Sequence, residues 1–134
     1  MGKLVLDTNA LIRSIPKISP YHDLYFSLFD GRNSLCVSNE MIEEYEEVIE
    51  RHANHMIAKS IIQQILNNEN TILITPYFSY NLIQADPDDN KFVDCAICAD
   101  AKFIVTEDKH FQILKEIEFP KIDIITLDEI IQII

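Results

Sequence analysis

The sequence predicts an α/β fold in which a central parallel sheet of about five strands is covered by helices on both faces. Short, almost continuously apolar segments alternate with longer segments whose apolar residues recur at helical spacing, and strands separated by helices are typical of a parallel sheet. The chain has 134 residues, 48% of them hydrophobic. A domain of this size buries roughly 70% of its unfolded surface, so we expect one domain over residues 1–134 with a single core.

The first half of the chain supplies two of the strands and four helices. The predicted elements are a strand at 3–7, helices at 9–15 and 20–30, a strand at 34–38, and helices at 39–51 and 54–67. Pro16 and Gly31 follow the first two helices, as expected for residues that end a helix. In the third helix the apolar residues Met41, Tyr45 and Ile49 recur at a spacing that places them on one face.

The second half supplies three more strands, each followed or preceded by a helix. The predicted elements are strands at 71–75, 102–106 and 122–125 and helices at 88–100, 109–116 and 127–133. Pro76 closes the first of these strands, and a loop is expected from there through residue 87. Asp86 and Asp88 are expected to be turn and cap residues, because their side chains can accept hydrogen bonds from the free amides of the helix that follows.

Composition excludes several classes of protein. Only two glycines occur, Gly2 and Gly31, so the chain cannot build a glycine-rich phosphate loop. A net charge of −11 opposes passive attraction to nucleic acid and indicates a basic or cationic partner, a site that needs metal, or simply an acidic surface. We expect a cytoplasmic protein without a membrane segment, because no apolar stretch approaches the roughly 20 residues of a span and no signal-peptide pattern occurs.

Acidic residues follow the predicted strands at the points where they end. Asp7 ends the first strand, the second leads into a glutamate-rich helix, and Asp108 follows the strand at 102–106. The helix before that strand opens with Asp89 and carries Asp94 further in. Carboxyl ends of parallel strands meet at one edge of a sheet, which is where ligands bind in such folds. Carboxylates gathered there would repel one another, and a hard divalent cation such as Mg²⁺ or Mn²⁺ would relieve the repulsion.

Three segments carry a resemblance to a known family. They read LVLDTNALI near the start, SNEMIEEYEEVIER in the middle and DPDDNKFVDCAICADAKFIVTEDKHFQIL near the end. In this order and spacing the sequence resembles the PIN-domain ribonucleases, particularly the bacterial branch regarded as toxins of toxin–antitoxin pairs. The resemblance implies a single PIN-like (Rossmann-like) domain and a Mg²⁺- or Mn²⁺-dependent endoribonuclease that hydrolyses RNA phosphodiester bonds. It also implies an antitoxin partner and a homodimer.

The resemblance also implies roles for particular residues. The implied catalytic and metal-binding residues are Asp7, Glu44, Asp89, Asp94 and Asp108, with the third ligand left open between Asp89 and Asp94. The small polar residues expected to orient carboxylates and waters are Thr8, Asn9, Ser38 and Thr106. The residues expected to meet RNA phosphates, because they lie near predicted strand ends or helix starts, are Arg13, Lys91 and Lys109. His110 is expected at the surface, with contact to substrate as the alternative.

Two other functions would also place acids at or after strand ends. A receiver-like or regulatory divalent-metal-binding module, acting through a protein partner, would also gather acids at strand ends. It needs an acid pair beside the first strand and an aspartate on the third, whereas the first strand here ends in the single acid Asp7 and the third at Thr75. A phosphatase with an aspartyl nucleophile needs a second acid two residues after Asp7, and Asn9 stands there. The pattern therefore favours the nuclease.

Overall fold

The five strands of the computed structural model, which describes residues 2–134, lie in one parallel sheet of order β3-β2-β1-β4-β5. The strands are β1 (Gly2–Leu6), β2 (Asn33–Val37), β3 (Ile72–Leu73), β4 (Phe103–Val105) and β5 (Ile124–Ile125). The α-helices are α1 (Thr8–Ser14), α2 (His22–Ser27), α3 (Asn39–His52), α4 (His55–Asn67), α5 (Asn90–Ala99) and α6 (Leu127–Ile133). Two 3₁₀ helices, η1 (Pro87–Asp89) and η2 (Lys109–Glu116), complete the fold. The predicted fold class is confirmed.

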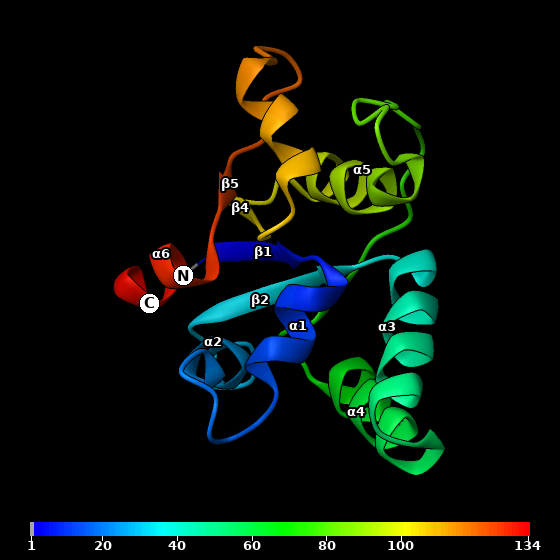
Figure 1. Cartoon of the computed structure of the whole chain (residues 1–134), viewed down its shortest axis with the longest axis vertical. Coiled ribbons are helices and arrows are strands. Elements are labelled where there is room, and N and C mark those ends of the chain that lie inside the picture. Colours follow the sequence, from blue (N-terminus) through cyan, green and yellow to red (C-terminus); the bar gives the residue numbers. More distant parts are fainter. Residues whose placement is uncertain (1) are drawn as a thin grey trace.

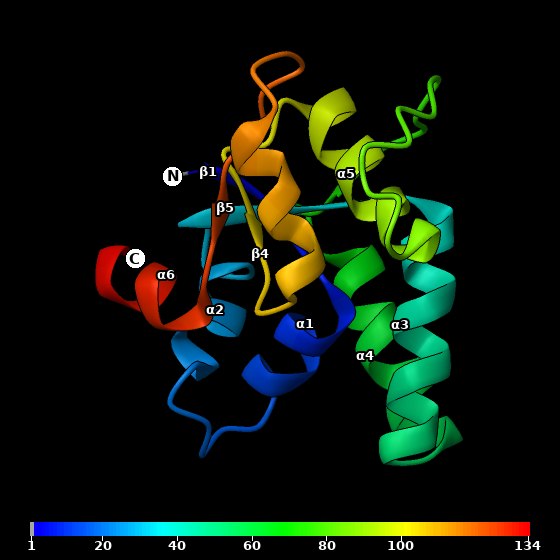
Figure 2. The ribbon, with the colours of Figure 1, turned by 45° about the horizontal axis from the view of Figure 1, so that its top comes forward.

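Helices lie on both sides of the sheet. In Figure 1, α5 lies on one side of the strands, where it contacts β1, β2 and β4, and α1 and α2 lie on the other. Helices α3 and α4 pack against each other beside the sheet, as Figure 2 also shows, and α3 contacts both α1 and α5. No helix in residues 2–134 is both long enough and apolar enough to cross a lipid bilayer.

The structure differs from the predicted elements mainly at the edges of the sheet. The strand expected at 71–75 contracts to Ile72–Leu73, because β3 pairs with β2 on one side only and Pro76 cannot donate to a ladder. The helix expected at 20–30 shortens to His22–Ser27. Residues 109–116 form a 3₁₀ helix, the tighter variant that usually occurs in short pieces.

Three hydrogen bonds fix the segments at the carboxyl ends of the central strands. The backbone N–H of Asp7 donates to the carbonyl of Val105 at 3.1 Å, which joins β1 to the end of β4. The hydroxyl of Tyr45, a completely buried residue of α3, donates to the carbonyl of Leu6 at 2.5 Å. The Ser38 side chain accepts from the backbone N–H of Met41 at 3.4 Å and caps α3 directly after β2. These contacts hold the start of α1 and the first half of α3 beside the end of β4.

Candidate active site

Asp7 lies buried at the end of β1 and caps α1. Its Oδ1 accepts from the backbone N–H of Ala10 at 2.8 Å, and its Oδ2 accepts from the hydroxyl of Thr106. Burial raises the pKa of Asp7 above its ordinary value, and the negative charges of Asp108 and Glu107 add to the shift. The hydrogen bonds from Thr106 and Ala10 oppose it without cancelling it. A nearby cation would relieve the cost of keeping this carboxylate ionised.

Asp108 reaches the same place from β4. Its side chain caps η2 by accepting from the backbone N–H of His110 at 2.9 Å. Its own backbone N–H donates to Thr106 Oγ1 at 3.0 Å. Since the Thr106 hydroxyl donates to Asp7, this one residue links the acid after β1 to the acid after β4. Asp7 and Asp108 therefore lie at the same edge of the sheet, as expected from the sequence, and share Thr106 as a hydrogen-bond partner.

Asp89 approaches from the start of α5. Its Oδ2 lies 3.6 Å from His110 Nδ1, and that nitrogen lies 3.5 Å from Asp108 Oδ1. Burial raises the pKa of Asp89 to about 6; Asp108, Asp86 and Asp7 add to the shift, and His110 opposes it. Asp89 therefore lies in the electrostatic field of both strand-end acids.

Asp89, Asp86 and His110 form a group with metal-ligating potential. One ligand atom from each lies within 4.8 Å of the other two. Asp89 Oδ2 and His110 Nδ1 are both buried and have no hydrogen-bond partner within residues 2–134. Buried polar atoms are normally satisfied, so an oxygen and a nitrogen left without partners beside further carboxylates fit a divalent cation.

Glu44 belongs to a neighbouring polar network. One of its carboxylate oxygens accepts from the Thr8 hydroxyl, and the other lies 2.7 Å from Lys91 Nζ. The same ammonium contacts the carboxylate and the carbonyl of Asp88, each at 2.8 Å. Burial opposes the charge on Lys91, but the hydrogen bonds with Asp88 and Glu44 outweigh it and raise the lysine pKa. That Lys91 meets RNA phosphates stays a prediction. In the structure its ammonium already contacts two carboxylates.

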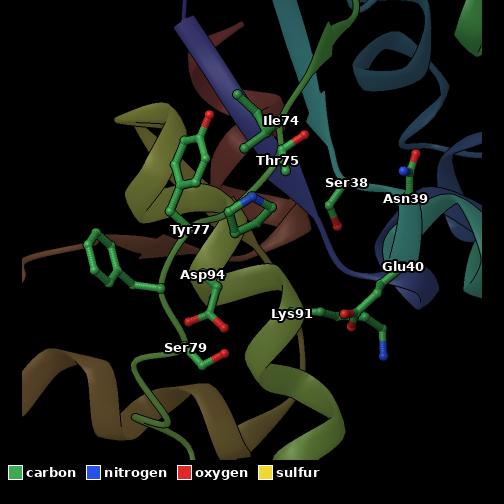
Figure 3. Close-up of a pocket in the computed structure, with 11 residues that line it drawn as sticks. Ser38, Asn39, Glu40, Ile74, Thr75, Tyr77, Ser79, Lys91 and Asp94 are labelled. Carbon is green, nitrogen blue, oxygen red and sulfur yellow. The ribbon is translucent and has the colours of Figure 1, made fainter.

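Asp94 faces a different space. It lines a pocket of about 280 Å³ together with Ser38, Glu40 and residues of the segment after β3. Figure 3 shows Asp94 on α5 beside Ser79 and Tyr77, with Ser38 and Glu40 on the other side of the pocket. The Asp94 carboxylate accepts from the backbone N–H of Tyr80 at 3.1 Å. Burial raises the pKa of Asp94 above its ordinary value, and the charge of Glu40 adds to the shift. The hydrogen bond from Tyr80 opposes the shift without cancelling it.

One helical turn before Asp94, the buried Asn90 holds the same segment. Its side-chain oxygen accepts from the backbone N–H of Ile83 at 2.9 Å, and its side-chain nitrogen donates to the Ile83 carbonyl at 2.8 Å. This face of α5 therefore anchors the irregular residues between β3 and η1, and that places Asp86 and Asp89 at the site. Whether Asp89 or Asp94 is the third ligand stays open. Asp89 lies beside His110, which also lies near Asp108, whereas Asp94 lines the adjoining pocket.

The other predicted residues divide between the site and its rim. Thr8 and Thr106 hold carboxylates, as described, and Ser38 caps α3 and lines the pocket. Arg13 and Lys109 lie exposed at the rim, where Arg13 lies 3.9 Å from a carboxylate oxygen of Glu107 and stacks over the Tyr21 ring. Asn9 is exposed at the start of α1.

Sequence reasoning missed the place of His110 in this site. It expects His110 at the surface, with contact to substrate as the alternative, and gives it no place among the ligands. In the structure the side chain is partly exposed, and its Nδ1 lies near Asp89 and Asp108. One signal could have indicated this: His110 comes two residues after the cap of a short helix, where the cap carboxylate and the second residue lie close together. The packing of the next residue, Phe111, against Phe92 of α5 was not readable from the sequence.

Comparison with known proteins identifies the family of the chain. A family model described as the PIN domain matches residues 3–110. The chain belongs to the PIN domain family. No curated protein matches it.

Solved structures show the same fold. This PIN domain is similar to VapBC2 from Rickettsia felis bound to a promoter DNA fragment, with a TM-score of 0.64, 16% identity, and coverage of 92% of this chain and 98% of that chain. For VapBC-1 from nontypeable Haemophilus influenzae the TM-score is 0.63 and the identity 16%, with coverage of 95% of this chain and 99% of that chain. For DNA-bound VapBC from Salmonella typhimurium the TM-score is 0.64 and the identity 19%, again with coverage of 95% of this chain and 99% of that chain. At these identities the likeness shows the fold of the PIN domain.

The raised pKa of Asp89 predicts how the metal-free PIN domain responds to pH. An acid whose pKa rises on folding favours the folded state when protonated, so its contribution is fully present below about 3.8 and is lost as the pH rises through about 6. We expect the melting temperature in EDTA to fall between pH 5 and pH 7 by more in wild type than in Asp89→Asn. Equal falls in the two proteins would contradict this expectation.

Proposed function

We propose that this PIN domain is a metal-dependent endoribonuclease that hydrolyses RNA phosphodiester bonds with Mg²⁺ or Mn²⁺. The observation that carries the proposal is the convergence of Asp7, Asp89 and Asp108, which come from three separate segments. The charge of Asp108 helps to raise the pKa of both Asp7 and Asp89, and the charge of Asp7 helps to raise that of Asp89. PIN domains are generally nucleases and usually bind divalent metals, which agrees with the orphaned ligand atoms at this site.

The side chains hold and orient the reacting groups in this proposal. Asp7, Asp89 and Asp108 would hold the ion, and Glu44 would join them or orient a water from its position beside Thr8. A bound divalent ion supplies an activated water and polarises the phosphodiester. Thr106 fixes the carboxylate of Asp7 and the backbone of Asp108, so that neither has to reorganise when substrate arrives. No side chain forms a covalent intermediate.

Unpaired RNA suits the surface beside the acids. Tyr77 and Phe78 are 84% and 70% exposed at the pocket that Asp94 lines. Exposed aromatic rings stack on the faces of unpaired bases, the usual mode by which proteins read single-stranded RNA. Because the net charge of −11 repels phosphates, base stacking and a few rim cations would have to supply much of the affinity.

Rim cations should show themselves in the salt dependence of RNA binding. We expect Lys109→Ala and Arg13→Ala each to weaken binding to a metal-loaded, cleavage-inactive protein and to reduce the slope of log affinity against log salt by about 0.7, the value for one contact to a single strand. The measurement is fluorescence anisotropy over a salt series. Lys59→Ala, on the exposed face of α4, is the matched control; slopes that stay the same in all three variants would remove Arg13 and Lys109 from the substrate path.

The direct test of the function is cleavage by the purified protein. We expect single-stranded RNA to be cut with Mn²⁺ or Mg²⁺, cutting to stop in EDTA, and a DNA of the same sequence to be cut much more slowly. Products that end at internal positions would establish endonuclease action. Failure to cut any RNA in a broad panel with either metal, by a folded protein that binds the metal, would contradict the proposal and favour a regulatory metal-binding module.

We also propose that the chain is the toxin of a bacterial toxin–antitoxin pair, acting in the cytoplasm as a homodimer of one-domain chains. The structural neighbours described above are VapBC complexes, and a basic antitoxin segment would suit the acidic site. Co-expression with the product of a small adjacent gene should yield a stable complex in which RNA cleavage is inhibited. Light scattering on the isolated protein tests the dimer.

A further inference from the structure

We propose that His110 Nδ1 is a ligand of the divalent cation, and that this nitrogen makes the site prefer Mn²⁺ or another first-row transition ion to Mg²⁺. The inference rests on the metal site of the proposed function, but it concerns which ion binds and by which atoms. It does not depend on which substrate is cut.

The position of His110 fits a ligand better than a hydrogen-bond partner. Its Nδ1 lies 3.6 Å from Asp89 Oδ2 and 3.5 Å from Asp108 Oδ1, and it makes no hydrogen bond with residues 2–134. Good hydrogen bonds between nitrogen and oxygen are about 2.7–3.2 Å long. Both separations are longer than that, so this nitrogen faces two carboxylate oxygens without a hydrogen bond to either.

The ring is held in place by its neighbours on η2. The backbone N–H of His110 donates to Asp108 Oδ1, which fixes the start of the 3₁₀ helix beside that carboxylate. The next residue, Phe111, is fully buried and packs against Phe92 of α5, with ring centroids 6.5 Å apart. Because α5 follows directly after Asp89, this aromatic contact keeps His110 and Asp89 together. The backbone and the core thus orient the imidazole before any ion arrives.

The donor set around His110 mixes nitrogen with oxygen. Asp86, Asp89 and His110 offer ligand atoms within 4.8 Å of one another, and Asp108 Oδ1 lies 3.5 Å from His110 Nδ1. Mg²⁺ prefers an all-oxygen octahedral shell and retains its waters, whereas imidazole suits transition ions. Binding through Nδ1 requires the neutral ring with its proton on Nε2. A site built only of carboxylates would distinguish these ions less strongly.

A rival role is available for the same histidine. As an imidazolium it could act only as a counterion for Asp89 and Asp108. A counterion would be displaced by the metal rather than bound to it, so replacing His110 would leave the metal-bound spectrum unchanged. The two roles therefore differ in a property that can be measured without any substrate.

Metal binding to the full chain tests the proposal. MnCl₂ and MgCl₂ are titrated separately by calorimetry into wild type, His110→Ala, His110→Asp and His52→Ala. His52 is the matched control, an exposed histidine at the end of α3 whose Nδ1 contacts the carbonyl of Val48 at 2.9 Å. The Mn²⁺ complexes are then examined by pulsed electron paramagnetic resonance for modulation from a directly bound ¹⁴N nucleus. Melting curves in EDTA show whether each variant is folded.

We expect wild type and His52→Ala to show ¹⁴N modulation and a preference for Mn²⁺. His110→Ala should lose the modulation and about tenfold or more in Mn²⁺ affinity, with a much smaller change for Mg²⁺. His110→Asp, which supplies oxygen instead, should bind both ions without modulation and shift the preference towards Mg²⁺. A wild-type Mn²⁺ complex without modulation, or an unchanged ratio of affinities in His110→Ala, would overturn the proposal.

The outcome is separable from that of the proposed function. Nitrogen coordination without RNA cleavage would support His110 as ligand and contradict the ribonuclease. Metal-dependent RNA cleavage with no nitrogen signal would support the ribonuclease and contradict His110 as a ligand.

Discussion

Replacing Asp7 with asparagine is expected to abolish metal-dependent RNA cleavage while leaving the fold intact. The substitution removes the charge of the acid that links β1 to the site, and losing one preorganised electrostatic group commonly costs about 10²–10³ in kcat or more. The fold should survive, because asparagine is also a good cap and can still accept from the N–H of Ala10. Its side-chain amide can donate to Thr106 Oγ1 where the carboxylate accepted.

The same variant makes a second measurement possible. Since burial raises the pKa of Asp7, the ionised carboxylate destabilises the metal-free protein at neutral pH, and removing the charge should raise its melting temperature in EDTA. Adding Mn²⁺ should then stabilise wild type more than Asp7→Asn. The matched control is Asp123→Asn, an acid exposed beside β5, which should change neither cleavage nor the response to metal. Cleavage by Asp7→Asn at the wild-type rate would show that the assigned site is wrong.

Replacing Lys91 with methionine is expected to produce the largest loss of stability. The Lys91 side chain is 9% exposed and its ammonium lies 2.7 Å from Glu44 and 2.8 Å from Asp88. Removing one partner of a buried ion pair costs about 3–5 kcal/mol. Because Glu44 is 24% exposed and Asp88 is 78% exposed, water can recover part of this loss, so we expect about 2–3 kcal/mol at neutral pH.

Two further variants isolate the cause. Adding Glu44→Gln to Lys91→Met should restore part of the lost stability, because the glutamate is then no longer an unpaired charge. Lys91→Met alone should bind Mn²⁺ more tightly than wild type, since one positive charge has left an acidic site. Lys59→Met, on the exposed face of α4, is the control and should be close to neutral in urea unfolding. A Lys91→Met protein as stable as wild type would mean that the ion pair contributes nothing.

The central elements could be predicted from the sequence because local signals agree with the tertiary context there. The helix expected at 39–51 is observed at Asn39–His52, where a serine cap and apolar residues at helical spacing mark the same element. The strand expected at 71–75 is observed at Ile72–Leu73. Its length depends on how much of an edge strand finds a partner, which is not a property of its own residues.

Candidate ligands divide in the same way. Asp7 and Asp108 were placed at one edge by strand order alone, and the structure joins both to Thr106. The sequence does not predict which of Asp89 and Asp94 lies nearer to Asp108, because this depends on which face of α5 holds the segment after β3. Asn90 and Asp94 bind that segment through Ile83 and Tyr80, and Asp89 points towards His110 instead.

The sequence by itself determined the α/β class, the alternation of strands and helices, and the gathering of acids at the carboxyl ends of the strands. These follow from periodicity and strand order, which are written along the chain. Only the tertiary structure decided that Lys91 neutralises Glu44 and that His110 stands between Asp89 and Asp108. Such contacts depend on differences of a few ångströms between residues far apart in sequence, and these distances are set by how buried residues such as Phe92 and Phe111 pack.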